Sequence, residues 1–253
     1  MAKIVAIANQ KGGVGKTTTA INLSACVAYS GKKVLLIDLD PQGNATTGLG
    51  IDKRSDNKSS YDAIINGENA QDCIIHTCQE NLDLMSSSIS LAGAEIELVS
   101  LMSRESKLKM ALEDIIDDYD FIFIDCPPAL GLLTLNALTA ANTVLVPIQC
   151  EFFALEGLAQ LVDTIKQVQK YLNRKLTVEG VVMTMFDIRT NLSAEVVDEV
   201  RKYFGDKVYR TLIPRNVKLG ECPSYGIPII QYDPKSKGAE AYLELAAEVI
   251  GEN

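Results

Sequence analysis

Eight consecutive residues near the N-terminus combine glycine, lysine and hydroxyl side chains in a pattern suited to holding phosphate. They are Lys11, Gly12, Gly13, Val14, Gly15, Lys16, Thr17 and Thr18. An apolar β-branched run at 4–8 precedes them and an apolar-periodic stretch at 20–28 follows, which predicts a strand, a glycine loop and a helix. In such a loop the backbone N–H groups and the positive end of the helix dipole face phosphate oxygens. We expect Lys16 to reach the β- and γ-phosphates of a nucleotide and the Thr17 hydroxyl to ligate Mg²⁺.

The loop departs from the common phosphate-binding pattern at its start. Gln10 occupies the place where a first glycine usually stands, and Lys11 adds a second lysine. One lysine suffices for the nucleotide bound by its own loop. Lys11 therefore either has a separate task against the transferring phosphoryl group or is a solvated loop lysine.

Aspartates end two further apolar runs. Asp38 and Asp40 follow the run 34–37, and Asp125 follows the run 121–124. A carboxylate at a strand end is how phosphate-loop proteins face Mg²⁺, often through a water molecule, and we predict this role for Asp125. Asp38 is expected to support the waters of the metal or the loop, and Asp40 to orient the attacking water as a weak base. A single aspartate of this kind is more often a turn former, but two such strand ends beside the glycine loop disfavour that interpretation.

The elements that must position these residues alternate between strands and helices. Strands are expected at 3–8, 34–38, 82–85, 121–125, 143–147, 178–184 and 208–213. Helices are expected near 16–30, 92–99, 105–117, 131–140, 154–172, 193–204 and 236–250. The alternation predicts a doubly wound, mostly parallel β-sheet flanked by helices, an α/β fold forming a single domain over residues 1–253. Ligands in such folds lie beyond the carboxyl ends of the strands.

Composition excludes several classes of protein. The chain is 47% hydrophobic and 23% charged, as in ordinary globular proteins, and contains no apolar run long enough to span a membrane. The first strand begins at once, so we expect no signal peptide. The six cysteines are scattered without a Cys-x-x-Cys pair, which indicates reduced thiols in a cytoplasmic protein. His76 is the only histidine, which excludes a metal site built from several histidines.

The net charge of −9 conceals a basic segment. Residues 166–218 carry 11 Lys and Arg against 6 Asp and Glu, whereas the segments on either side are acidic. A local basic segment in an acidic protein is compatible with a nucleic-acid partner, although the charge alone favours a solvated charged face.

Together these motifs resemble the ParA/MinD family of deviant Walker ATPases, and within it the Soj-type chromosomal ParA proteins. The resemblance runs over nearly the whole chain. It is carried by the segments 9–19, 38–44, 125–128, 133–137, 154–157 and 213–216. The glycine loop alone would not separate the branches of the family.

The resemblance implies a weak ATPase that uses ATP and Mg²⁺ and closes into a homodimer around the nucleotide. Lys11 would then touch the partner's nucleotide, Gly12 would pack where the subunits meet, and Asp40 would be needed for hydrolysis. Pro214 to Asn216 would lie beside the adenine.

The same resemblance implies non-specific binding to double-stranded DNA by the ATP dimer. The matching positions are Arg189, in a Thr-Met-x-Asp-x-Arg stretch, and Lys218, where arginine is more usual. Lysine keeps the charge that a phosphate contact requires. A ParB-like centromere-binding protein would stimulate hydrolysis, and the protein would be cytoplasmic and associated with the nucleoid.

Three other classes share the loop or the fold. A MinD-like membrane-cycling ATPase needs a basic amphipathic C-terminal helix, but 239–253 carries four glutamates and no Lys or Arg, so no membrane partner is expected. An iron–sulfur electron carrier needs paired cysteines in suitable surroundings. A deviant-loop ATPase acting on a protein or small substrate needs a pocket built by insertions, and none is evident in the sequence.

Overall fold

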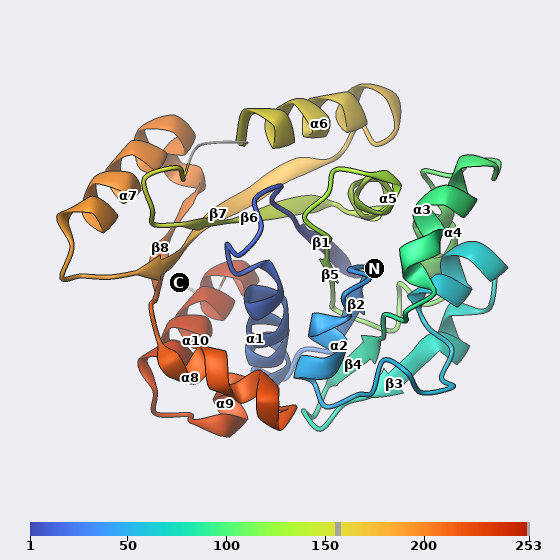
Figure 1. Cartoon of the computed structure of the whole chain (residues 1–253), viewed down its shortest axis with the longest axis horizontal. Coiled ribbons are helices and arrows are strands. Elements are labelled where there is room, and N and C mark those ends of the chain that lie inside the picture. Colours follow the sequence, from blue (N-terminus) through green and yellow to red (C-terminus); the bar gives the residue numbers. More distant parts are fainter. Residues whose placement is uncertain (155–157, 252–253) are drawn as a thin grey trace.

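The structure is a computed structural model that describes residues 1–154 and 158–251. In these ranges the chain forms one eight-stranded sheet in the order β3-β4-β2-β5-β1-β6-β7-β8 (Figure 1). The strands are β1 (Lys3–Ile7), β2 (Val34–Asp38), β3 (Ile74–His76), β4 (Leu82–Met85), β5 (Phe121–Asp125), β6 (Thr143–Gln149), β7 (Thr177–Phe186) and β8 (Val208–Pro214). Every pairing is parallel except that of the edge strand β3 with β4. The predicted α/β fold with a mostly parallel sheet is therefore confirmed.

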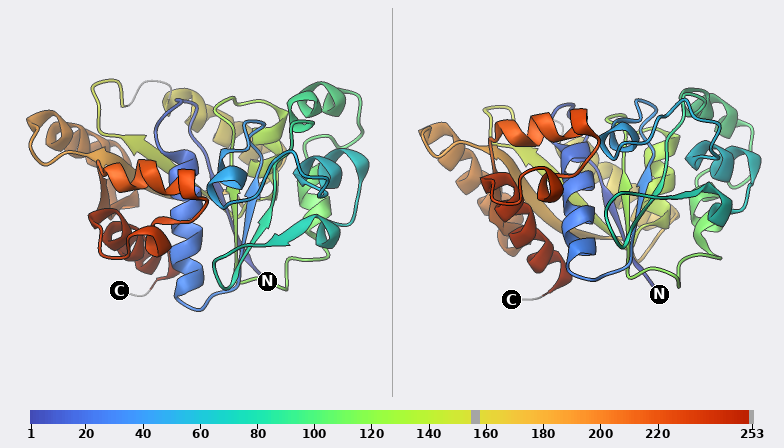
Figure 2. Two further views of the ribbon diagram at one scale, coloured as in Figure 1. Left: turned by 60° about the horizontal axis from the view of Figure 1, so that its bottom comes forward. Right: turned by 90° about the horizontal axis from the view of Figure 1, so that it is seen from below.

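Helices cover both faces of the sheet, as Figures 1 and 2 show. The helices are α1 (Lys16–Tyr29), α2 (Asn44–Gly48), α3 (Leu91–Val99), α4 (Lys107–Leu112), α5 (Leu132–Ala140), α6 (Leu158–Tyr171), α7 (Asn191–Phe204), α8 (Val217–Glu221), α9 (Ile229–Tyr232) and α10 (Lys237–Ile250). Short π or 3₁₀ turns are η1 (Asp62–Asn66), η2 (Ala70–Cys73), η3 (Gly205–Lys207) and η4 (Cys222–Tyr225).

The two faces have separate apolar cores. One core joins α1 and α10 to the sheet together with α2, α8 and α9, and the other lies under α3 to α7. Strands β2 and β5 are buried along their whole length because side chains on both faces are covered. This double cover holds the carboxyl ends of the central strands rigidly at one edge.

Several boundaries differ from the sequence-based expectations. The helix expected at 105–117 ends at Leu112, where Glu113, Asp114 and further acidic residues follow. Acidic groups oppose the negative end of the helix dipole, which disfavours extending that helix. The strand β3 was not predicted, since it has only three residues, none of them fully buried. Of the helix expected at 154–172, Ala154 forms a turn and α6 runs over Leu158–Tyr171, while the motif residues 155–157 lie outside the described residues.

Candidate functional site

The glycine loop and the strand-end aspartates meet because their strands are neighbours. β2, β5 and β1 are adjacent in the sheet, with Asp38 in register with Asp125 and Ile7 in register with Asp125. The loop that follows Ile7 therefore begins beside both carboxylates. Three segments far apart in the sequence supply one site at the carboxyl edge of the sheet, as the fold class predicts.

The glycine loop takes a conformation that needs its glycines. Gly13 and Gly15 have φ of +74° and +85°, which side chains other than glycine rarely adopt. The Thr184 hydroxyl at the end of β7 donates to the Val14 carbonyl oxygen over 2.8 Å and so anchors the loop to the sheet. The Asn9 side chain accepts from the Lys11 N–H over 3.0 Å. These two hydrogen bonds, from Thr184 on β7 and within the segment 9–11, fix the backbone of the loop.

Lys16 is the buried cation of the site. Its side chain is only 7% exposed, and its Nζ donates to the Lys11 carbonyl oxygen over 3.0 Å. Burial lowers the pKa of Lys16, while the nearby Asp125 opposes that shift. An ammonium held in such a position is costly without a negative partner, and phosphate oxygens would supply one.

Asp125 is a fully buried carboxylate whose two oxygens have no hydrogen-bond partner in the described part of the chain. Burial raises its pKa well above the ordinary value and repulsion from Asp38 adds to the shift, while the nearby Thr17 side chain and Lys16 oppose it. Buried polar groups are normally satisfied, so an orphaned carboxylate indicates a missing cation or water. Its position fits a water-mediated contact with Mg²⁺. Among the described residues no group of three or more His, Cys, Asp or Glu forms a metal cluster, so phosphates and waters would complete the coordination.

The carboxylate of Asp38 forms hydrogen bonds with the segment 40–46 that follows β2. Its Oδ2 accepts from the N–H and the hydroxyl of Thr46 over 2.8 and 2.7 Å, and its Oδ1 accepts from the Asp40 N–H. Burial raises the pKa of Asp38 to about 6, although the Thr46 hydrogen bonds oppose the shift. Of the two roles expected for this residue, the hydrogen bonds favour support of the loop.

Asp40 lies on a turn at the edge of the phosphate pocket. The pocket is lined by Gly12, Gly13, Gly15, Lys16, Thr17, Thr18, Asp40, Gln42, Asn44, Pro128 and Met185. Asp40 is almost buried, and its Oδ1 accepts from the Gln42 N–H over 2.9 Å. The expected catalytic carboxylate and the phosphate-binding loop therefore face one cavity.

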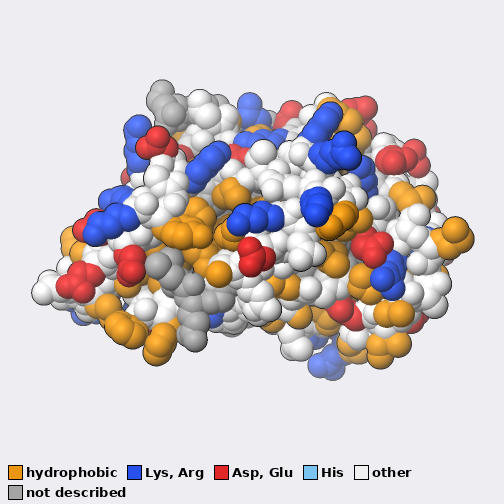
Figure 3. Space-filling view, turned by 90° about the horizontal axis from the view of Figure 1, so that it is seen from above, with side chains coloured by type: hydrophobic (Ala, Val, Ile, Leu, Met, Phe, Trp, Pro, Cys, Tyr) orange, Lys and Arg blue, Asp and Glu red, His pale blue; other side chains and the backbone are white. Residues whose placement is uncertain are grey.

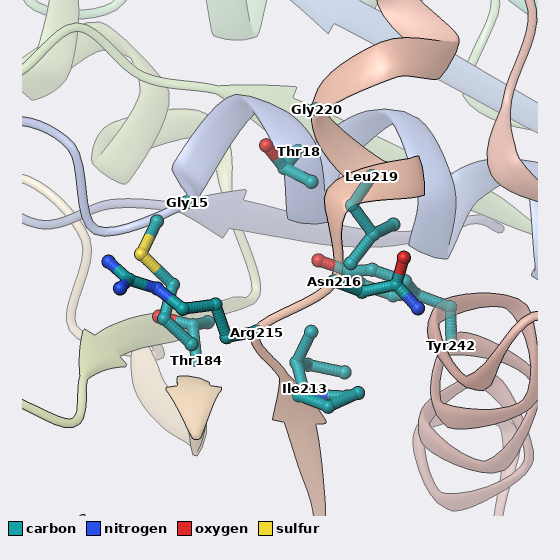
Figure 4. A pocket seen from close by; sticks show the side chains of 11 residues that line it. Gly15, Thr18, Thr184, Ile213, Arg215, Asn216, Leu219, Gly220 and Tyr242 are labelled. Atoms are coloured by element: carbon teal, nitrogen blue, oxygen red, sulfur yellow. The ribbon is translucent and has the colours of Figure 1, made fainter. Parts of the chain in front are cut away.

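A second, more apolar pocket adjoins the glycine loop (Figure 4). Gly15 and Thr18 border it on one side, and Pro214 and Asn216 on the other. Ile213, Leu219 and Tyr242 add apolar walls of a kind that suits a flat base. The predicted loop from Pro214 to Asn216 is thus placed next to the phosphate pocket, where an adenine would lie.

The two expected DNA-binding residues lie on the surface and are each paired with a carboxylate. Arg189 is 82% exposed and forms two hydrogen bonds with Asp187. Lys218 contacts Glu221 over 3.0 Å. On the face in Figure 3, basic side chains are interspersed with acidic ones rather than gathered into one band.

A family model described as an AAA domain matches residues 2–178. The sporulation initiation inhibitor protein Soj of Bacillus subtilis is 61% identical over 249 residues, which cover 98% of each chain. This chain belongs to the ParA/MinD family. The chromosome partitioning protein ParA of Myxococcus xanthus is 52% identical to it over 98% of this chain and 88% of the other. A cobyrinic acid a,c-diamide synthase of Mycobacterium smegmatis, solved with ADP and magnesium, has a TM-score of 0.88 at 39% identity, covering 99% of this chain and 94% of that one.

The extent of these matches bears on the ParA assignment. The AAA family model ends before Arg189 and Lys218, whereas the match to Soj continues over nearly the whole chain. The assignment to the ParA/MinD family therefore does not depend on the glycine loop alone.

Sequence reasoning did not find several residues that shape this ParA-type site. Thr184 and Thr46 anchor the loop and Asp38, and Met185 lines both pockets with φ of +53°. Positive φ is uncommon for a side chain other than glycine and often accompanies a functional site. The only signal for Thr184 and Met185 in the sequence was their place in the Thr-Met-x-Asp-x-Arg stretch.

Proposed function

We propose that this protein is an ATP-dependent DNA-partitioning ATPase. Supporting this are Lys16 and Asp40, which line one phosphate pocket, and the orphaned Asp125 near Lys16, in a chain 61% identical to Soj. Relatives named chromosome partitioning proteins and a related structure holding ADP and magnesium support the same conclusion.

ATP and Mg²⁺ would be held by the residues that line the two pockets. Backbone N–H groups from Gly12 to Thr18 surround the phosphates, Lys16 pairs with the β- and γ-oxygens, and Pro214 and Asn216 border the base. Thr17 would ligate Mg²⁺ and Asp125 would hold one of its waters, while Asp38 would support the loop. The metal neutralises charge on the phosphates.

Hydrolysis depends on a water molecule oriented by Asp40. The carboxylate lies on the wall of the phosphate pocket, and the Gln42 N–H fixes one of its oxygens. Asp40 is a weak base, so its main contribution is to position the water. We therefore expect slow turnover that a ParB-like partner would stimulate.

The active form is a homodimer closed by ATP. Gly12 is exposed, and a Cβ added there would meet no atom of its own chain within 4 Å. We therefore expect a larger side chain at Gly12 to obstruct a surface that covers the pocket from outside. Lys11, at the start of the same loop, would contribute its charge to the partner's nucleotide, as an arginine finger does elsewhere.

The dimer binds DNA through Arg189 and Lys218 without reading sequence. A pair of exposed cations binds duplex phosphates weakly, but two such patches held together release twice the counterions. Binding of ATP thus gates binding of DNA, and hydrolysis releases it. The protein would act in the cytoplasm on the nucleoid, with a ParB-like protein as partner.

Three variants test the proposal with one set of measurements. Lys16→Ala should lose nucleotide binding, Gly12→Val should bind ATP but remain monomeric by light scattering, and Asp40→Ala should form a stable ATP dimer without hydrolysis. If Asp40→Ala turned over ATP at the wild-type rate, the assigned role of Asp40 would be wrong. If Gly12→Val dimerised normally, the proposed interface would be wrong.

The 39% identity to a cobyrinic acid a,c-diamide synthase favours a second candidate, an ATPase acting on a small acidic substrate. Such an enzyme would turn over ATP only with that substrate and would not require DNA. No helix in the described ranges has the length and apolarity to cross a bilayer. The MinD-like alternative needs a basic helix that lies on the membrane surface. The outer face of α10 carries Glu240 and Glu244, so flotation with anionic vesicles and ATP should show no binding.

A further inference from the structure

A lysine from the loop after α2 holds the turn that carries Asp40. The Nζ of Lys53 donates to the carbonyl oxygen of Gln42 over 2.6 Å. The partner of this ammonium is a backbone carbonyl rather than a carboxylate, so the contact constrains the turn directly. Gln42 and Asp40 both line the phosphate pocket, whereas Lys53 lies outside it.

The stem of Lys53 also covers the turn. Gly43 has φ of +62°, and a Cβ built there would lie 2.9 Å from Cδ of Lys53. The space that a larger residue would need at position 43 is therefore occupied by the lysine side chain. The methylene chain and the ammonium act on two successive residues of the same turn.

The peptide group between Gln42 and Gly43 links Lys53 to Asp40. Its oxygen accepts from Lys53, and its N–H, on Gly43, donates to the Asp40 carbonyl oxygen over 2.8 Å. Hydrogen bonds at the two ends of one peptide group polarise each other and so strengthen together. The preceding N–H, on Gln42, donates to the Asp40 carboxylate.

We propose that Lys53 is a positioning residue for ATP hydrolysis, which fixes the Asp40 carboxylate at the edge of the phosphate pocket. This inference rests on the proposed role of Asp40. It gives a task to the loop 51–58, which follows α2. Lys53 does not touch the nucleotide in this arrangement, so its loss should slow hydrolysis and leave nucleotide affinity unchanged.

The test compares steady-state ATP hydrolysis, without DNA, in a matched set of variants. Lys53→Met keeps the stem and removes the ammonium, and Lys53→Arg keeps the charge. Lys58→Met is the control, because that lysine lies in the same loop but binds Glu68 and Asp72 instead. We expect Lys53→Met to lower kcat about five-fold, as the loss of one charged hydrogen bond allows, with KM unchanged. Lys53→Arg should recover most of the rate, and Lys58→Met should match wild type.

Asp40→Ala measured beside the lysine variants, together with a thermal melt, keeps the result interpretable. Melting temperatures of Lys53→Met and Lys58→Met equal to that of wild type would show that the fold is intact. An inactive Asp40→Ala with a fully active Lys53→Met would overturn the role of Lys53 alone. Wild-type activity in Asp40→Ala would overturn both assignments, and a raised KM with unchanged kcat would make Lys53 a nucleotide contact instead.

Discussion

Arg189 and Asp187 form a two-pronged ion pair on the loop between β7 and α7. The guanidinium Nε and Nη2 donate to the two carboxylate oxygens over 2.9 and 2.7 Å. Together with the Arg189 backbone N–H, these bonds hold the pKa of Asp187 well below its usual range. The cation proposed to contact DNA is therefore already satisfied within its own chain, and DNA phosphates must compete with a carboxylate.

Asp187→Asn should strengthen DNA binding in the ATP state. Removing the competing charge is expected to raise affinity about two- to five-fold, because exposed ion pairs are weak. Asp198→Asn is the control, since it removes an exposed charge from the adjacent α7 without touching this pair. The effect should be the same at pH 6 and pH 8, because the depressed pKa of Asp187 keeps the pair charged at both. Equal affinities for the two variants would show that the pair does not restrain Arg189.

Asp125→Asn should stabilise the nucleotide-free protein against unfolding and impair its Mg²⁺-dependent binding of nucleotide. Asparagine replaces a carboxyl group whose ionised form is disfavoured by burial and by Asp38, which we expect to raise the free energy of unfolding by about 0.5–2 kcal/mol. In urea melts with EDTA the variant should have the higher midpoint. In nucleotide titrations its dependence on Mg²⁺ should be lost. A lower midpoint would mean that the carboxylate is satisfied in solution.

The same buried carboxylates give stability a definite pH dependence. The pKa of Asp38 is about 6 in the folded state and about 3.9 in an unfolded chain, so the folded state binds more protons between these values. Stability without nucleotide should therefore fall as pH rises from about 4 to 6 through this contribution. Urea melts of wild type and Asp38→Asn between these pH values isolate the contribution of Asp38. The free energy of unfolding of wild type, relative to that of the variant, should fall as pH rises.

Thr46→Val should destabilise the site more than Thr47→Val. The Thr46 hydroxyl donates to Asp38 and accepts from the Ser87 N–H over 2.7 and 2.9 Å, so valine leaves the Ser87 N–H without this acceptor and removes one of the two hydrogen bonds that Thr46 gives to Asp38. A loss of about 1–3 kcal/mol in unfolding free energy is expected. Thr47, one residue further along α2, is exposed and serves as the matched control. Comparable losses in the two variants would contradict this account of the loop.

Five of the six thiols should resist labelling in the folded protein. The buried cysteines are Cys26, Cys73, Cys126, Cys150 and Cys222, and burial raises the pKa of each. A thiol reagent at pH 8 should therefore modify the exposed Cys78 rapidly, and all six thiols only after unfolding. Cys78→Ser should abolish the rapid phase. A second rapidly labelled thiol would indicate that part of the core opens readily.

The central strands and the glycine loop could be predicted from the sequence because each has a strong local pattern of residues. The runs ending at Asp38 and Asp125 are apolar on both faces, and Lys16 follows a distinctive glycine pattern. The edge strand β3 lacks such a signal, since Ile74–His76 is short and depends on pairing with β4.

The contacts that tune the site could not be predicted from the sequence. Lys53 reaches Gln42 from eleven residues away, and Thr184 reaches Val14 across 170 residues. Neither spacing has a local periodicity, so only the three-dimensional arrangement of the strands brings these pairs together. The position of Asp187 two residues before Arg189 was visible, but the geometry that joins them was not.

Binding to random-sequence duplex DNA tests the central proposal most directly. It should be measured without nucleotide, with ADP, with ATP and with a slowly hydrolysed ATP analogue, each across a series of salt concentrations. The account predicts tight binding only with ATP or the analogue, weakening steeply as salt rises and lost in Arg189→Glu. Binding that is equal in all nucleotide states, or absent from all of them, would contradict an ATP-gated DNA-binding ATPase.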